Sequence, residues 1–332
     1  MTARRYLVTG GSGFIGSALV RRLLSDGHTV RVLDNNSRGA LRRLSGVEQD
    51  VEFLNADIRD AAAVRRAAQG IDSIVHLAYV NGTELFYSQP EFVLDVAVRG
   101  MLSVLDACRE ESVGELLLAS SSEVYQTPPH VPTAEDVPLS VPDVLNPRYS
   151  YGGGKIACEL MAINYGRTGF DRVMIVRPHN VYGPDMGWEH VLPQFILRAH
   201  DAIAAHPTGD VPFPIQGDGT QRRAFTHIDD FTDALLHVLH SGEHLEIYHA
   251  GNPDEMSIRD VVGEVFGHLG RTPTIIAGPA PAGATPRRCP DITKLSLLGF
   301  KPSISLRDGL PDMVDWYLSN LNLRPAMTAH QA

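Results

Sequence analysis

Two residues of the segment YSYGGGKIACE, residues 149–159, have the chemical types and the spacing needed for proton transfer. Tyr151 and Lys155 stand four residues apart, so both side chains lie on one face if the segment is helical. The pKa of a phenol is about 10, but a nearby ammonium group and the positive end of a helix both favour the phenolate. The pair therefore predicts a general base that works near neutral pH. The same spacing also occurs on ordinary solvated helices, so the pair alone leaves that alternative open.

The three glycines between Tyr151 and Lys155 are unusual, because glycine costs about 0.5–1 kcal/mol relative to alanine inside a helix. The residues that follow, KIACELMAINYG, nevertheless have Ile156, Leu160 and Ile163 at helical spacing and predict a helix over about 150–168. We interpret glycines 152–154 as positions that exclude side-chain bulk, either beside bound ligands or against a packed helix.

The elements that must position this pair alternate between strands and helices. Short runs rich in leucine and β-branched residues predict strands at 5–10, 29–34, 51–57, 71–78, 114–122, 172–178 and 244–252. Helical patterns lie between them at about 14–26, 60–69, 90–111 and 150–168. This alternation indicates an α/β fold with a doubly wound parallel sheet of the Rossmann type.

The second half of the chain is less regular, and prolines and glycines crowd residues 178–220. We expect residues 1–178, with a return segment at about 226–252, to form a dinucleotide-binding Rossmann domain. Residues 179–225 and 253–320 are expected to form a smaller C-terminal lobe that binds substrate over the carboxyl edge of the sheet. Residues 321–332 are expected to be a loose tail.

A glycine-rich turn joins the first predicted strand to the first predicted helix in VTGGSGFIGSALV. Gly10 allows a tight turn, Gly13 lets a pyrophosphate approach the helix N-terminus, and Gly16 lets the helix pack closely on the sheet. Asp34 ends the second strand, where a carboxylate would bind the adenosine ribose hydroxyls and repel a 2′-phosphate. The arrangement favours NAD over NADP, although Arg38 weakens that exclusion. Glycines that merely end a strand are the alternative.

The neighbouring positions extend this cofactor site. Asp57, after the third strand, either meets the adenine edge or caps the helix at 60–69. The further residues expected to line the cofactor are Phe14, Ile15, Asn35, Ile58, Leu77 and Ala78.

Composition excludes several functional classes. The 332 residues carry a net charge of −10, which disfavours a general nucleic-acid surface. Cys108, Cys158 and Cys289 are scattered and odd in number, as expected for reduced thiols rather than for a disulfide framework or a metal site. The start of the chain does not have the pattern of a signal peptide, and no run of 18 apolar residues occurs. We therefore expect a cytoplasmic protein without a membrane, metal or nucleic-acid partner.

Five segments together resemble the extended short-chain dehydrogenase/reductases: TGGSGFIG, the aspartate of the second strand, ASSSEVY, YGGGK and RPHNVYGP. Over about residues 4–318 the chain looks more narrowly like the NAD-dependent nucleotide-sugar epimerases, dehydratases and decarboxylases. The resemblance implies a bound NAD that is reduced and reoxidised within one turnover and a nucleotide-diphosphate sugar that passes through a 4-keto intermediate. It also implies a homodimer formed through the helices at 90–111 and 150–168.

The resemblance also implies roles for individual residues. Ser121 would hydrogen-bond the reacting sugar oxygen beside Tyr151, and Lys155 would also hold the nicotinamide ribose. Pro178 would line the nicotinamide, and Asn180 would contact the diphosphate of the sugar nucleotide.

Arginines are the expected phosphate ligands, because a guanidinium group binds phosphate through two parallel hydrogen bonds. Arg223 matches the phosphate-binding arginine of the family, whereas its neighbour Arg222 fits an exposed charge. Arg287 is the second candidate, with Arg288 as the open alternative. The residues expected to shape the sugar and base pockets are Tyr182, His179 and the loop GWEHVLPQF, in which Glu189 and His190 are interpreted as solvated.

Two positions depart from the family pattern. Ala97 stands where the family usually has an asparagine near the nicotinamide, which removes one expected cofactor hydrogen bond. Gly154 stands where the family usually has serine or threonine before the lysine.

The residues after Ser121 bear on the reaction. The family's 4,6-dehydratases have adjacent Asp and Glu as acid and base, whereas this chain has Ser122 and Glu123. The missing acid disfavours dehydration, and a Ser–Glu pair also resembles the UDP-glucuronate decarboxylases. A 4-epimerase needs neither group. We therefore predict a nucleotide-sugar 4-epimerase, with a decarboxylase, a dehydratase and a non-catalytic NAD-binding sensor as alternatives.

Overall fold

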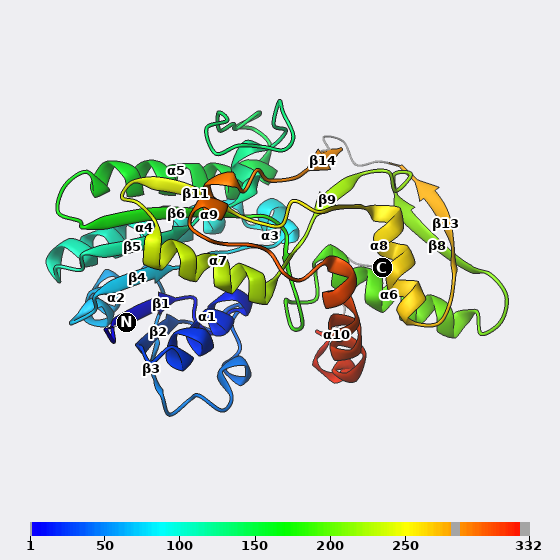
Figure 1. Cartoon of the computed structure of the whole chain (residues 1–332), viewed down its shortest axis with the longest axis horizontal. Coiled ribbons are helices and arrows are strands. Elements are labelled where there is room, and N and C mark those ends of the chain that lie inside the picture. Colours follow the sequence, from blue (N-terminus) through cyan, green and yellow to red (C-terminus); the bar gives the residue numbers. More distant parts are fainter. Residues whose placement is uncertain (1, 280–285, 326–332) are drawn as a thin grey trace.

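Seven strands make the central sheet, in the spatial order β11-β6-β5-β4-β1-β2-β3 (Figure 1). In the computed structural model, which describes residues 2–279 and 286–325, all neighbouring strands of this sheet are parallel, and Val8 of β1 lies opposite Val32 of β2 and Val75 of β4. The strands are β1 (Arg5–Thr9), β2 (Thr29–Asp34), β3 (Val51–Asn55), β4 (Ser73–His76), β5 (Glu115–Ala119), β6 (Arg172–Pro178) and β11 (Glu246–Ala250). The predicted doubly wound α/β fold is confirmed.

Helices cover both faces of the sheet, because successive residues of a strand point to opposite sides. Leu7, Ile74 and Leu116 are buried in the cluster that includes the helices of one face, and Tyr6 and Val75 are buried in the cluster of the other. The first face is covered by α2 (Ala61–Ala68), α4 (Pro90–Glu110) and α5 (Ser150–Gly166), and the second by α1 (Phe14–Ser25), α7 (Ile228–Ser241) and α9 (Thr293–Leu297).

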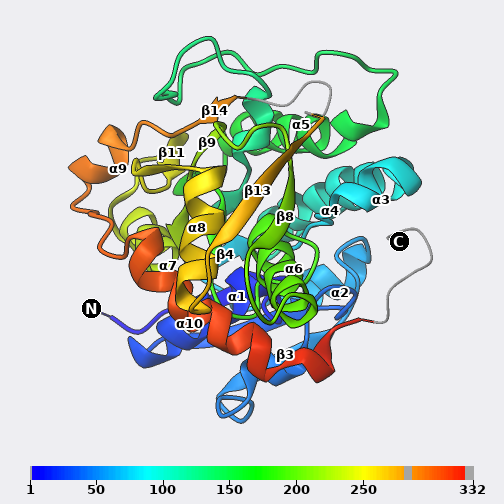
Figure 2. The same ribbon diagram turned by 90° about the vertical axis from the view of Figure 1, so that its right-hand side faces the viewer.

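A smaller lobe stands beyond the carboxyl edge of the sheet, at the right of Figure 1 and toward the viewer in Figure 2. Phe213, Phe266 and Tyr317 are buried in its separate core. The lobe contains α6 (Val191–Ala205), β8 (Val211–Gln216), α8 (Ile258–His268), β13 (Pro273–Gly278) and α10 (Leu306–Ser319). Short strands join it to the sheet, namely β7 (Val181–Tyr182), β9 (Arg222–Ala224), β10 (Thr226–His227), β12 (Glu255–Ser257) and β14 (Arg287–Arg288).

The remaining elements are short and lie in the connections. They are η1 (Leu41–Leu44), α3 (Thr83–Ser88), η2 (Ser122–Tyr125), η3 (Pro147–Tyr149) and η4 (Leu321–Leu323). None of the helices within the described ranges is long and apolar enough to cross a membrane.

We propose the two-lobe division that the sequence suggests, with one change. Ile292, Leu295 and Phe300, in and around α9, are buried against the sheet rather than in the core of the smaller lobe. This stretch therefore belongs with the Rossmann part, although the sequence assigned all of 253–320 to the lobe. In the expected tail, residues 321–323 form η4, and residues 326–332 lie outside the described residues.

The strand order fixes where a ligand can bind. The chain moves outward from β1 to β2 and β3 on one side, and it then returns to place β4 on the other side of β1. Where the order reverses, the loops after β1 and β4 diverge and leave a crevice outside the carboxyl ends of the strands. The glycine loop, the Ser121 loop and the start of α5 all face that edge.

Candidate active site

A crevice of about 470 Å³ lies at the carboxyl ends of β1, β4, β5 and β6, and a smaller pocket of about 120 Å³ continues it toward β2 and β3. This volume is typical of ligand pockets, which span roughly 300–1,000 Å³. Every residue that the sequence assigned to the cofactor lines one of the two. The crevice is lined by Gly10, Gly13, Phe14, Ile15, Gly16, Leu77, Tyr151, Lys155 and Pro178, and the smaller pocket by Asp34, Asn35, Asp57, Ile58 and Ala78, with Gly10, Gly13 and Leu77 shared.

The glycine loop is built for close backbone approach. Gly10 has a φ of +74°, and a Cβ added there would lie 2.8 Å from the backbone N of Ala78, so both the conformation and the space require glycine. A Cβ at Gly16 would overlap the carbonyl O of Gly10. The loop therefore sits directly on the start of α1, where free backbone N–H groups can bind a pyrophosphate.

Asp34 is buried at the end of β2, with its carboxylate held by the backbone. One oxygen accepts the N–H of Ser12 at 3.0 Å, and the other accepts the N–H of Asn36 at 2.9 Å. Arg38 lines both pockets, and its guanidinium lies 3.7 Å from Glu189. A fixed carboxylate beside the smaller pocket fits the ribose hydroxyls of NAD, so the loop and Asp34 together fit this dinucleotide.

Asp57 does not cap the following helix. Asp60 is the N-cap of α2, and its side chain accepts the N–H of Ala63 at 3.0 Å. The carboxylate of Asp57 instead pairs with Arg59 at 2.8 Å and accepts from Asn35 at 3.1 Å. The hydrogen bonds from Arg59 lower the pKa of Asp57 to about 2. Of the two interpretations from sequence, the helix cap is wrong, and the position beside the adenosine pocket stays open to test.

Tyr151 and Ser121 meet inside the crevice. Tyr151 lies in the first turn of α5, both residues line the crevice, and the side chain of Ser121 is close enough to lower the pKa of the Tyr151 phenol. Ser121 follows β5 as the N-cap of η2, and its Oγ accepts the N–H of Glu123 at 3.1 Å. The end of a buried strand and the start of a helix thus bring two hydroxyl side chains into one crevice.

The charge state of Tyr151 differs from the expectation. Burial raises its pKa to about 12, more than Ser121 lowers it, and Glu123 raises it further. Lys155 donates to the carbonyl O of Ala119 at 2.7 Å, and burial lowers the pKa of this lysine to about 8. The groups of the chain alone therefore keep Tyr151 as a neutral phenol. The predicted phenolate needs a further positive charge in the crevice.

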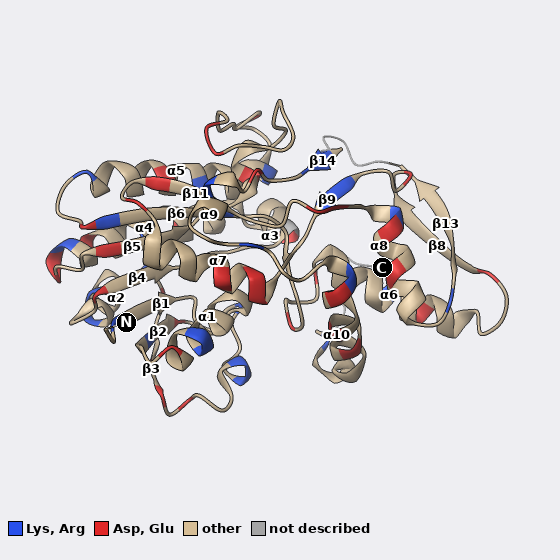
Figure 3. Cartoon of the chain, in the orientation of Figure 1, with Lys and Arg blue, Asp and Glu red and all other residues tan. Residues whose placement is uncertain are grey.

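Arg288, which the sequence left open as the alternative to Arg287, lies in the crevice. Arg288 pairs with Glu123 at 2.5 Å, and its Nε is buried with no hydrogen-bond partner among the residues that the structure describes. The guanidinium of Arg287 instead pairs with Glu255, and the Arg287 side chain is 45% exposed. Arg287 and Arg223 do not line the crevice among the described residues. Figure 3 shows the blue strands β9 and β14, which carry these arginines, side by side between the two lobes.

The segment after β6 is divided between crevice and core. Asn180 lines the crevice, and its amide donates to the carbonyl O of Ala224 at 2.7 Å. His179 was expected to shape the pocket, but it is buried behind it, 4.8 Å from the ring of His249. His190 was interpreted as solvated, whereas it lines the crevice, and burial lowers its pKa.

The three glycines at 152–154 in α5 differ in how much space surrounds them. A Cβ at Gly152 would lie 2.7 Å from the Gln126 side chain, at the wall of the crevice. A Cβ at Gly154 would overlap the hydroxyl of Tyr79, on the side that packs against α4. A Cβ at Gly153 would make only an ordinary contact with Val141 at 3.5 Å. Bulk is therefore excluded at two of the three positions.

Several crevice residues were not found from the sequence. Tyr79, Phe86, Gln126 and Arg148 line it, and the ring of Phe86 stacks on Tyr151 with the ring centres 4.9 Å apart. Tyr79 lies three residues after the end of β4, at the ligand-binding edge, and this position is the one signal that could have singled it out. Phe86 in α3, Arg148 in η3 and Gln126 at the end of η2 lie in short connecting elements whose path depends on tertiary contacts.

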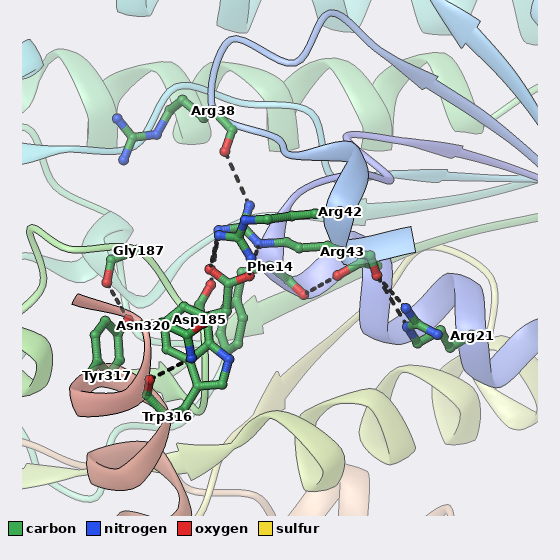
Figure 4. Close-up of polar contacts among 11 residues, drawn as sticks. Phe14, Arg21, Arg38, Arg42, Arg43, Asp185, Gly187, Trp316, Tyr317 and Asn320 are labelled. Carbon is green, nitrogen blue, oxygen red and sulfur yellow. Dashed lines mark hydrogen bonds and ion pairs between the residues drawn. The ribbon is translucent and has the colours of Figure 1, made fainter. Parts of the chain in front are cut away.

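An arginine cluster joins the two lobes beside the crevice. Arg42 and Arg43 in η1 both bind the carboxylate of Asp185, with Arg43 Nε at 2.9 Å (Figure 4). The segment that contains Asp185 continues to Met186 and Gly187, which line the same crevice as the glycine loop. These ion pairs therefore hold this segment to η1 beside the crevice.

Comparison with known proteins agrees with this geometry. Residues 6–251 match the NAD dependent epimerase/dehydratase family. A dTDP-4-dehydro-6-deoxy-D-allose reductase from Streptomyces sp is 32% identical over 96% of this chain and 98% of its own, and a UDP-glucose 4-epimerase from Mycolicibacterium smegmatis is 32% identical over 94% and 98%. The crystal structure of DesIV, a dTDP-glucose 4,6-dehydratase from Streptomyces venezuelae with NAD bound, superimposes with a TM-score of 0.84 at 32% identity, covering 96% of this chain and 98% of that one.

Proposed function

Because the chain belongs to the NAD-dependent epimerase/dehydratase family, we propose that it is a nucleotide-diphosphate-sugar 4-epimerase. In this reaction the sugar is oxidised at C4, turns over in the crevice as a 4-keto sugar, and is reduced again on its other face. Relatives with similar identity include a reductase and an epimerase, so the proposal of this particular reaction rests on the crevice residues.

The observation that carries the proposal is that Tyr151 and Ser121 line the same crevice, with Ser121 close enough to lower the pKa of the Tyr151 phenol. Two hydroxyls in one crevice can bind the same sugar oxygen. Ser121 donates a hydrogen bond to the 4-oxygen of the sugar. Tyr151 takes the proton of the 4-hydroxyl group as general base and later returns it. A bound NAD would supply the hydride acceptor and donor for C4, and its positive nicotinamide ring would supply the charge that favours the Tyr151 phenolate.

Ser122 weighs against dehydration. A 4,6-dehydratase must protonate the departing 6-hydroxyl, and a serine hydroxyl is a far weaker acid than a carboxylic acid. By the family resemblance Ser122 stands where the dehydratases have the acid, and it is 5% exposed and lines the crevice.

Decarboxylation of a uronic acid is the second candidate, favoured by the pairing of Arg288 with Glu123 at 2.5 Å. A guanidinium group in the crevice can bind a sugar carboxylate through two hydrogen bonds. A uronate would then compete with Glu123 for Arg288.

A substrate screen in deuterated water tests the proposal. The purified chain is incubated with UDP-, dTDP- and GDP-linked hexoses and uronic acids, and products are identified by mass spectrometry and proton NMR. We expect a C4 epimer of unchanged mass, with no deuterium at C4 or C5 and no net consumption of NAD. Loss of carbon dioxide or of water would refute the epimerase and identify a decarboxylase or a dehydratase. Tight NAD binding without any product would support the non-catalytic sensor.

A further inference from the structure

Tyr79 contacts both members of the Tyr151–Lys155 pair. It follows β4 and lies between the crevice and the smaller pocket, both of which it lines. The Lys155 Nζ lies 3.7 Å from the centre of the Tyr79 ring, and the Tyr79 hydroxyl donates to the carbonyl O of Tyr151 at 3.2 Å. The two tyrosine rings also meet edge to face at 5.2 Å and 84°.

The space for this phenol comes from two small residues. A Cβ at Gly154 would overlap the Tyr79 hydroxyl and would lie 3.1 Å from the Cβ of Ala97. A serine or threonine at 154 would therefore crowd the position that the Tyr79 hydroxyl occupies, and Ala97 borders the same space. The departure from the family pattern at Gly154 thus leaves room for the Tyr79 phenol.

Burial lowers the pKa of Lys155, and Cys158 and Glu159 oppose that shift only in part. His76 on β4 is neutral, because burial and Lys155 lower the pKa of this histidine to about 3. Burial raises the pKa of Cys158 to about 11, which keeps the thiol protonated. Glu159 is bound by Arg177 through both carboxylate oxygens. The Tyr79 ring and the Ala119 carbonyl are the groups in direct contact with the Lys155 ammonium that stabilise its charged form.

We propose that Tyr79 is a positioning residue for the Tyr151–Lys155 pair, with its ring holding the Lys155 ammonium group and its hydroxyl fixing the first turn of α5. Tyr79 acts through the pair and need not touch the sugar. A role of Tyr79 in catalysis rests on the proposed function. The contacts of Tyr79 with Tyr151 and Lys155 do not depend on the substrate.

The sequence makes a direct test possible, since Lys155, Lys294 and Lys301 are its only lysines. Protein labelled with lysine carrying ¹³C at Cε gives three signals, which Lys294→Arg and Lys301→Arg assign by elimination. A pH titration of the full chain then reads the pKa of Lys155 without substrate, so failure of the proposed function would leave this test intact.

Tyr79→Leu keeps an apolar side chain but removes the aromatic face. We expect the pKa of Lys155 to fall by about 0.4–1.5, the equivalent of one cation–π contact. Tyr79→Phe, which keeps the ring, should leave that pKa unchanged. Phe86→Leu is the matched control, because Phe86 stacks on Tyr151, and it should also leave the pKa unchanged. Equal Lys155 pKa values in folded Tyr79→Leu and parent protein would overturn the proposal.

A second test does not depend on Tyr79→Leu folding. Gly154→Ala should lower the melting temperature of the parent, because the new methyl group meets the Tyr79 hydroxyl, and should lower it less in the Tyr79→Phe background. Equal losses in both backgrounds would show that the hydroxyl does not fill that space, and would refute its part in the proposal.

Discussion

Glu159→Gln tests the buried ion pair that supports the candidate catalytic helix. Glu159, one turn after Lys155 on α5, is 4% exposed, and Arg177 on β6 is 2% exposed. Arg177 binds the two carboxylate oxygens at 2.9 and 2.6 Å, and the hydroxyl of Ser120 donates to the same carboxylate. The pair therefore ties α5 to the ends of β5 and β6, next to Ser121.

The expected loss is large because glutamine keeps the shape of the side chain but removes its charge. The guanidinium group of Arg177 would stay buried without a counter-ion, which costs about 3–5 kcal/mol. The entropy of unfolding is about 2.1 cal/mol/K per residue, or roughly 0.7 kcal/mol/K for 332 residues. We therefore expect the melting temperature to fall by about 4–7 °C.

Differential scanning calorimetry of parent and variant at the same pH and salt concentration measures this change. The matched control is Glu110→Gln, because Glu110 pairs with Arg65 at 3.0 Å on the surface, where it is 50% exposed. An exposed pair contributes about 1 kcal/mol or less, so the control should melt within about 1–2 °C of the parent. If Glu159→Gln melts as close to the parent as the control does, the pair is hydrated or dispensable and the reasoning fails.

Three further predictions concern catalysis, cofactor retention and assembly. Tyr151→Phe should lower kcat on the sugar found in the screen by about 10²–10⁴-fold while leaving NAD binding intact, since it removes only the proton acceptor; a kcat close to that of the parent would exclude Tyr151 as the base. Asp185→Asn should lower the free energy of unfolding in urea by about 1.5–3 kcal/mol and raise the Kd for NAD several-fold in a fluorescence titration, because Arg42 and Arg43 lose their shared carboxylate; an unchanged Kd would show that these ion pairs do not retain the cofactor. Leu160 is 61% exposed on α5, and we expect Leu160→Asp to convert a homodimer into a monomer in light scattering, whereas a monomeric parent would contradict the proposed assembly.

The sequence predicted the sheet and the cofactor loop well because both depend on local patterns. The strands at 29–34 and 172–178 have the predicted bounds, since a short run of leucine and β-branched residues is a property of the segment itself. Gly10 and Asp34 could be placed for the same reason, because a strand–turn–helix unit brings its own glycines and the end of the next strand to one edge of the sheet.

The choice between Arg287 and Arg288 could not be made from the sequence. The two residues are adjacent on the two-residue strand β14, so their side chains point to opposite sides, and no local pattern distinguishes them. The pairing of β14 with β9, and the position of Glu255 on β12, turn Arg287 outward and Arg288 toward Glu123.

By itself, the sequence determined the parallel sheet, the dinucleotide loop and the presence of a tyrosine and a lysine on one helical face. Only the tertiary structure decided what surrounds that pair. Tyr79 follows β4, 72 residues before Tyr151, and its hydroxyl fills the space left by Gly154. Contacts of this kind depend on shape and burial across distant segments, and the same burial sets the pKa of Tyr151 and Lys155.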